Sequence, residues 1–144
     1  MNATIRNFGY PATLVREWDH WTALLRPAQP TLGSLILAAR SEARAFADLS
    51  SEAFAELPQV VGVVEKALQK LISYEKINYL MLMMVDPHVH LHVIPRYDGI
   101  RSAPGGPAIV DTGWPKVPAL SDATTLSDTQ VRAMTAWMKP AFEG

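Results

Sequence analysis

Three of the four histidines of this 144-residue chain lie close together, at His88, His90 and His92. Residues two apart in a β-strand point to the same face, so the three imidazoles should line one side of a strand over residues 88–94. The residues between them are apolar and should anchor the strand in the core. Three histidines in strict alternation differ from an isolated core or surface histidine, and they indicate a functional site.

One chemistry that suits this row is phosphoryl transfer. A neutral imidazole is a nucleophile near pH 7, and a protonated imidazole donates two hydrogen bonds, so neighbouring rings can attack phosphorus and bind its oxygens. Adjacent imidazoles disfavour each other's positive charge, which helps to keep the nucleophile neutral.

The alternative is a divalent-metal site, because His90 and His92 share a strand face as a His-x-His pair. A third ligand from the same straight strand is difficult, since the Cα atoms of His88 and His92 should lie about 13 Å apart. The chain has no cysteine, which excludes a thiol nucleophile and a thiolate-based zinc site. We therefore expect neither a metal nor a cofactor, and we keep metal binding as the less favoured interpretation.

The first half of the chain predicts strands followed by a helix. Two short strands are expected over 12–26, around a turn, and a buried strand over 34–39. Ser50 is a candidate N-cap for a helix with an apolar stripe over 60–72, and Pro58 should either kink this helix or separate two shorter ones.

The second half predicts a hairpin, an irregular segment and a final helix. An apolar strand over 77–85 and the histidine strand should form an antiparallel hairpin across Asp86-Pro87. Prolines and glycines predict an irregular segment over 98–125, and Ser127 with Gln130 predicts a capped helix over 127–139. We therefore expect a single α+β domain over 1–144 with a mainly antiparallel sheet.

Charge and composition exclude several classes of partner. The chain has 13 basic and 14 acidic side chains and a formal net charge of −1, which argues against a binder of duplex nucleic acid. The longest apolar run, Tyr79–Val85, is far shorter than the roughly 20 residues that cross a bilayer. No membrane association is expected, and the lack of cysteine fits a cytoplasmic protein.

The segment His-Val-His-Leu-His-Val-Ile over 88–94 resembles the signature of the histidine triad (HIT) family, and Pro95-Arg96 continues it. Residues 25–31, Leu-Arg-Pro-Ala-Gln-Pro-Thr, resemble the proline loop of that family. The resemblance covers about residues 12–97. It implies a five-stranded, mainly antiparallel sheet with one long helix packed on it and a C-terminal helix.

The resemblance also implies a function and roles for the histidines. His90 would attack the α-phosphorus of a small nucleotide and form a covalent nucleotidyl-histidine intermediate, which water or another acceptor resolves. His92 would donate to phosphate oxygens and His88 would orient His90. The protein would be a metal-independent nucleotide hydrolase or nucleotidyl transferase, and a homodimer.

Three further residues are candidate substrate contacts: Leu25 in the proline loop, Ser34 after it, and Arg96 beyond the triad. Ser34 has a competing interpretation as a hydroxyl bonded to the backbone, and Arg96 as half of an ion pair with a carboxylate.

The sequence departs from the family pattern at Leu24, at Ser34 and over Met84-Val85-Asp86-Pro87, where polar groups around the ribose and leaving group are expected. These changes leave the nucleophile intact, but they count against the usual adenosine or dinucleoside polyphosphate substrates. They also motivate the alternative of a nucleotide-binding HIT-fold protein without turnover.

Overall fold

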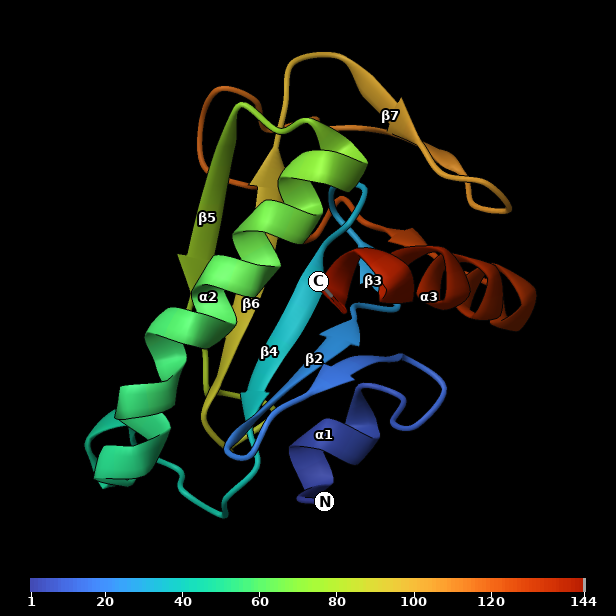
Figure 1. Ribbon diagram of the computed structural model, residues 1–144. Helices are drawn as coiled ribbons and strands as arrows, with labels where there is room; N and C mark the ends of the chain where they lie inside the picture. Colours follow the sequence, from blue (N-terminus) through green and yellow to red (C-terminus); the bar gives the residue numbers. More distant parts are fainter. Residues whose placement is uncertain (144) are drawn as a thin grey trace.

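The computed structural model describes residues 1–143, and its centre is a five-stranded antiparallel sheet in the order β1-β2-β4-β6-β5 (Figure 1). The strands are β1 Leu14–Glu17, β2 Trp21–Leu25, β4 Leu35–Ala39, β6 His90–Arg96 and β5 Lys76–Leu80. This confirms the predicted α+β class and the mainly antiparallel sheet. β6, which carries two of the three histidines, lies between β4 and β5.

Helix α2, Ser51–Ile72, packs on one face of the sheet (Figure 1). The Ser50 hydroxyl accepts from the Ala53 backbone N–H at 3.1 Å, which confirms the predicted N-cap. Pro58 lies inside the helix without ending it. Burial of the apolar stripe stabilises the helix enough to offset the hydrogen bond that proline removes.

Helix α3, Asp128–Phe142, packs against α2 and β1 and completes the layer on this face. Its capping box between Ser127 and Gln130 is present as predicted, but the helix continues through Pro140 instead of ending there. Trp21 on β2 is fully buried in this layer, and its indole N–H donates to the Ala53 carbonyl at 2.8 Å.

The opposite face of the sheet is covered in part by a short N-terminal helix, α1, Ala3–Asn7. Its Ile5 is fully buried against Leu24, Ile36 and Ala38, which alternate along β2 and β4 with the residues that face α2. The histidine positions of β6 pair with this same part of β4, Ala38 with His90 and Ile36 with His92.

The connection between β5 and β6 differs from expectation. β5 ends at Leu80, so the predicted tight turn at Asp86-Pro87 is wrong, and residues 81–89 form a longer connection to β6. The apolar run over 77–85 therefore contains both a strand and an exposed loop.

The segment over 98–125, which the sequence predicts to be irregular, contains short ladders. β7 Ile100–Ser102 pairs with β8 Ala108–Val110, and β9 Thr124–Thr125 pairs with β3 Ala28–Gln29 of the proline loop. A 3₁₀ turn, Phe46–Asp48, precedes α2. Over residues 1–143, no helix combines the length and apolar character needed to cross a bilayer.

Candidate active site

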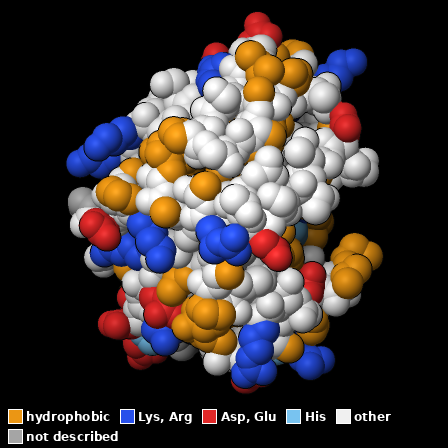
Figure 2. Space-filling view, turned by 90° about the vertical axis from the view of Figure 1, so that its right-hand side faces the viewer, with side chains coloured by type: hydrophobic (Ala, Val, Ile, Leu, Met, Phe, Trp, Pro, Cys, Tyr) orange, Lys and Arg blue, Asp and Glu red, His pale blue; other side chains and the backbone are white. Residues whose placement is uncertain are grey.

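His90 and His92 lie side by side on β6, with ring centroids 5.1 Å apart and an interplanar angle of 67°. Both are largely buried, at 1% and 7% exposure. They line a cavity of about 290 Å³ together with groups from three other parts of the chain: Phe8, Arg26, Leu82, Met84, Val85 and Asp86. On the face drawn in Figure 2, histidine contributes only small areas of surface.

The tautomer of His90 follows from one short contact. Its Nδ1 lies 2.7 Å from the carbonyl oxygen of His88. A carbonyl can only accept, so Nδ1 carries the proton and the lone pair of the neutral ring is on Nε2. Within residues 1–143, Nε2 of His90 makes no hydrogen bond. This is the arrangement that a nucleophilic imidazole requires.

His92 is held by Arg26. The Nε–H of Arg26 donates to Nδ1 of His92 at 3.3 Å, so the neutral form of His92 has its proton on Nε2. Burial, then the charge of Arg26 and the neighbouring His90, together lower the pKa of His92 to about 4, against a smaller opposing effect of Asp86. His92 is therefore a neutral hydrogen-bond donor at physiological pH.

The triad pattern and this geometry agree with the comparison with known families. The family model described as the HIT domain matches residues 8–99, well over half of the chain. The chain belongs to the HIT family. A search of curated proteins gives no significant match.

Solved structures share the fold, two of them of histidine triad proteins. A histidine triad protein from Bradyrhizobium japonicum is 18% identical with a TM-score of 0.72, covering 99% of this chain and 96% of its own. One from Sinorhizobium meliloti is 21% identical with a TM-score of 0.73, covering 98% and 95%. The diadenosine triphosphate hydrolase of Plasmodium falciparum is 12% identical with a TM-score of 0.69, covering 92% and 78%.

His88, the first histidine of the HIT motif, lies in a separate environment. It precedes β6, so the strand predicted over 88–94 begins two residues later than expected, and its ring does not line the cavity. Its Nδ1 lies 2.9 Å from the Thr4 hydroxyl, which also accepts the His88 backbone N–H at 3.2 Å. Its Nε2 lies 3.3 Å from Oε1 of Glu42. His88 reaches His90 through its carbonyl group, while its own ring is fixed by Thr4 and Glu42.

The three predicted substrate contacts lie outside the lining of this cavity. Leu25 is fully buried in the core that faces α2, because its position in β2 points it away from the histidine face. Ser34 is also fully buried, and its hydroxyl donates to the Thr31 carbonyl at 2.8 Å. For Ser34 the competing interpretation, a hydroxyl bonded to the backbone, is the correct one.

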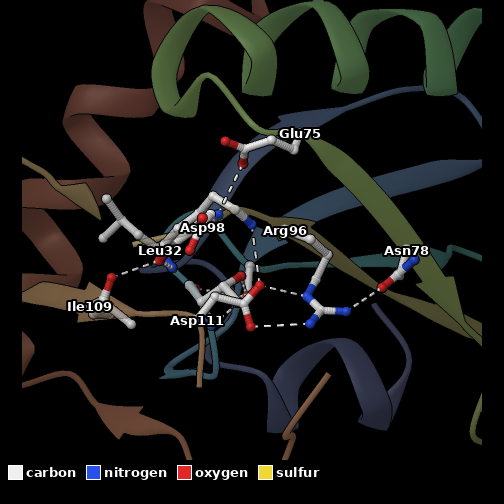
Figure 3. Close-up of polar contacts among 10 residues, drawn as sticks. Leu32, Glu75, Asn78, Arg96, Asp98, Ile109 and Asp111 are labelled. Atoms are coloured by element: carbon white, nitrogen blue, oxygen red, sulfur yellow. Dashed lines mark hydrogen bonds and ion pairs between the residues drawn. The ribbon is translucent and has the colours of Figure 1, made fainter. Parts of the chain in front are cut away.

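Arg96 forms an ion pair with a carboxylate, as Figure 3 shows. Its Nε and Nη2 donate to the two carboxylate oxygens of Asp111 at 2.7 and 3.2 Å, and Nη1 donates to Asn78 at 2.8 Å. Arg96 is 3% exposed. It lies four positions after His92, about 13 Å along a strand. We therefore correct the predicted phosphate contact: Arg96 is structural.

Sequence reasoning missed four residues that contact the histidines: Thr4, Phe8, Arg26 and Glu42. The Phe8 ring lies 5.6 Å from that of His90 and 6.1 Å from that of His92. Helix α1 is too short for its periodicity to be recognised, so Thr4 and Phe8 left no usable signal. Arg26 lies inside the proline-loop segment over 25–31, where a search for cationic side chains would have found it.

The loop after β5 gives the cavity an apolar rim. Met84 and Val85 are 84% and 92% exposed although both are apolar, and they line the same cavity as the histidines. The departures at Met84-Val85-Asp86-Pro87 therefore lie at the site. Of the other two departures, Leu24 is covered by Ile5 and Ser34 is fully buried.

The described residues contain no cluster of three or more His, Cys, Asp or Glu side chains suited to a metal ion.

Proposed function

We propose that this HIT protein is a nucleotide hydrolase or nucleotidyl transferase that acts at the α-phosphorus of a small nucleotide, with His90 as the nucleophile. The observation that carries the proposal is the 2.7 Å bond from Nδ1 of His90 to the His88 carbonyl, which leaves the Nε2 lone pair available beside a cavity. The named activity of the Plasmodium relative, hydrolysis of diadenosine triphosphate, is in keeping with this class of reaction.

The reaction proceeds in two displacements. Nε2 of His90 attacks phosphorus, forming an N–P bond and breaking the bond to the leaving group, which departs with the bonding electrons and takes a proton from solvent. The Nε2–H of His92 donates to a non-bridging oxygen, where charge accumulates. Water then attacks phosphorus and releases a proton to solvent, the electrons of the N–P bond return to Nε2, and a nucleoside monophosphate leaves. A different acceptor in this second step gives a transferase.

The cavity itself favours a substrate with little charge beyond the reacting phosphate. Arg26 is its single cationic side chain, Asp86 is anionic, and Leu82, Met84 and Val85 are apolar. A polyphosphate chain would place further negative charge near Asp86 with only one cation to neutralise it. The same apolar rim is the observation that favours the second candidate, a HIT-fold protein that binds a nucleotide without turnover.

The proposal is tested by kinetics on a panel of nucleoside phosphoramidates, dinucleoside polyphosphates and nucleoside phosphosulfates. Wild-type protein should release nucleoside monophosphate, and His90→Ala should reduce kcat by at least about a thousandfold, as expected when a nucleophile is removed. His20→Ala is the matched control, because His20 lies outside the cavity, and it should retain full activity. Nucleotide binding by the wild type in calorimetry, without any product, would instead support the binding protein.

We also propose that two copies form a homodimer by continuing the sheet at β5. Within residues 1–143, β5 pairs with β6 alone in this sheet, so its outer edge has backbone groups open to pairing. Ile77, Tyr79 and Val117 line a groove of about 630 Å³ along this edge. Sedimentation equilibrium should give twice the mass of the chain, and a monomer at micromolar concentration would refute the dimer.

A further inference from the structure

Arg26 is a cation placed inside the candidate active site by the loop that follows β2. Its Nε–H donates to Nδ1 of His92 at 3.3 Å, and its Nη1 donates to the Ala28 carbonyl. It lines the same cavity as His90 and His92 and is partly buried there, which lowers its pKa from the usual value. Neither the triad motif nor the mechanism above assigns it a role.

The direction of the bond to His92 is determined by chemistry. A guanidinium carries only donors and stays protonated in proteins, so Nδ1 of His92 must accept. A doubly protonated His92 would place an N–H against the N–H of Arg26. The charged and titratable groups that face His92 are Arg26, His90 and Asp86; the first two, with burial, lower the pKa of His92, and Asp86 raises it.

We propose that Arg26 is a positioning residue that keeps His92 neutral with its proton on Nε2, and that its guanidinium provides the permanent positive charge beside the phosphoryl group. The proposal rests on the proposed function in taking this cavity as the phosphoryl site. A charged histidine would lose its proton within the physiological pH range, whereas a guanidinium does not. The hydrogen bond that His92 donates is therefore constant across neutral pH.

The loop over 26–34 holds Arg26 firmly enough for this role. The Arg26 backbone N–H donates to the Ser34 carbonyl at 3.0 Å, and the Gln29 side chain donates to the carbonyls of Arg26 and Ser34 at 2.6 and 2.9 Å. Gln29 also accepts the Gly33 backbone N–H at 2.9 Å. Gly33 has φ of +88°, and a Cβ there would approach the Ile72 side chain to 2.9 Å, so the turn requires glycine.

The test is the protonation state of His92 in ligand-free protein, measured by long-range ¹H–¹⁵N NMR between pH 4 and pH 8. In the wild type, His92 should stay neutral with its proton on Nε2 down to about pH 5. In Arg26→Met its titration midpoint should rise by roughly one unit, because a neighbouring positive charge is removed, and both tautomers should appear. Arg132→Met, which removes an exposed arginine of α3, is the matched control and should leave the His92 signals unchanged.

Two results would overturn the proposal. One is a wild-type His92 that carries its proton on Nδ1 at pH 7 or titrates near the ordinary value of about 6.5. The other is an identical titration of His92 in the wild type and in Arg26→Met. The first result is measured on the wild-type protein, so it does not depend on whether the variant folds. Neither requires turnover, so an inactive wild-type protein would refute the proposed function and leave these spectra unaffected.

Discussion

At the scale of single residues, two neighbouring imidazoles of the site have different tautomers because their Nδ1 atoms have different hydrogen-bond partners. The acceptor carbonyl of His88 places the His90 proton on Nδ1, while the donor guanidinium of Arg26 places the His92 proton on Nε2. One ring thus presents a lone pair to the cavity and its neighbour presents a donor. The motif predicts which histidines are involved, but the partners that make them different come from remote parts of the chain.

The low pKa of His92 predicts a pH dependence of stability. Its pKa is about 4 in the folded protein and about 6.5 when unfolded, so the unfolded state binds the proton first as the pH falls below 6.5. The free energy of unfolding should therefore decrease with falling pH across this window. Between pH 7 and pH 5, His92 should account for a loss on the order of 2 kcal/mol.

Urea denaturation of the wild type and of His92→Gln at both pH values measures this contribution, because the difference between the two proteins cancels the other titrating groups. Gln offers an oxygen to accept from Arg26 and does not titrate. Equal losses of stability in the two proteins would show that His92 does not carry the effect.

At the scale of elements, alternation along strands was the most informative part of the sequence. It predicted strands over 12–26, where β1 and β2 lie, and placed His90 and His92 on one face, whereas β4 was predicted from a short apolar run. It failed over 77–85, because a run that is apolar throughout has no alternation to show where the strand ends. Met84 and Val85 are among the most exposed large hydrophobic side chains, and both line the cavity beside His90 and His92.

Helix α1 illustrates a different limit, because its role depends on contacts across long sequence separations. Thr4 contacts His88 eighty-four positions away, through both the ring and the backbone of the histidine. A five-residue helix has no amphipathic period of its own, and its stability comes from packing. Neither Thr4 nor Glu42 could be assigned to the site from composition or spacing.

Removing the Thr4 hydroxyl is expected to affect both stability and catalysis. Thr4→Val preserves the shape but leaves the buried Nδ1 and backbone N–H of His88 without partners, which should cost about 1–3 kcal/mol of unfolding free energy. The His88 carbonyl that orients His90 then becomes less well fixed, so kcat should fall about tenfold. Urea denaturation and steady-state kinetics measure the two effects.

The control for this variant is Arg6→Ala, which changes an exposed residue of the same helix. It should leave kcat unchanged and shift the midpoint of urea denaturation only slightly. If Thr4→Val behaves like Arg6→Ala, α1 does not position the histidines.

At the scale of the whole molecule, the ion pair of Arg96 and Asp111 joins the end of β6 to the segment over 98–125. Asp111 also accepts the backbone N–H of Tyr97, whose hydroxyl donates to the Ile109 carbonyl at 2.9 Å and accepts the Leu32 backbone N–H at 2.8 Å (Figure 3). Burial raises the pKa of Tyr97 to about 12, so it remains a neutral phenol. This network ties the segment over 98–125 to the sheet.

Asp111→Ala should destabilise the protein by about 3–5 kcal/mol, because it leaves the buried guanidinium of Arg96 without its counter-ion. Glu75→Gln is the contrasting variant: it removes the charge of an exposed pair with Arg101 at 3.5 Å and should cost at most about 1 kcal/mol. Chemical denaturation of both proteins gives the comparison. A loss below 1 kcal/mol for Asp111→Ala would show that the ion pair does not hold the segment.

The most direct test of His90 as nucleophile is the location of the covalent intermediate. Wild-type protein is mixed with a nucleoside phosphoramidate, quenched within milliseconds to seconds, and digested for peptide mass spectrometry. A nucleotidyl group should be found on His90 and should be absent from His90→Ala. Product release without any adduct, or an adduct on His88 or His92, would contradict the account.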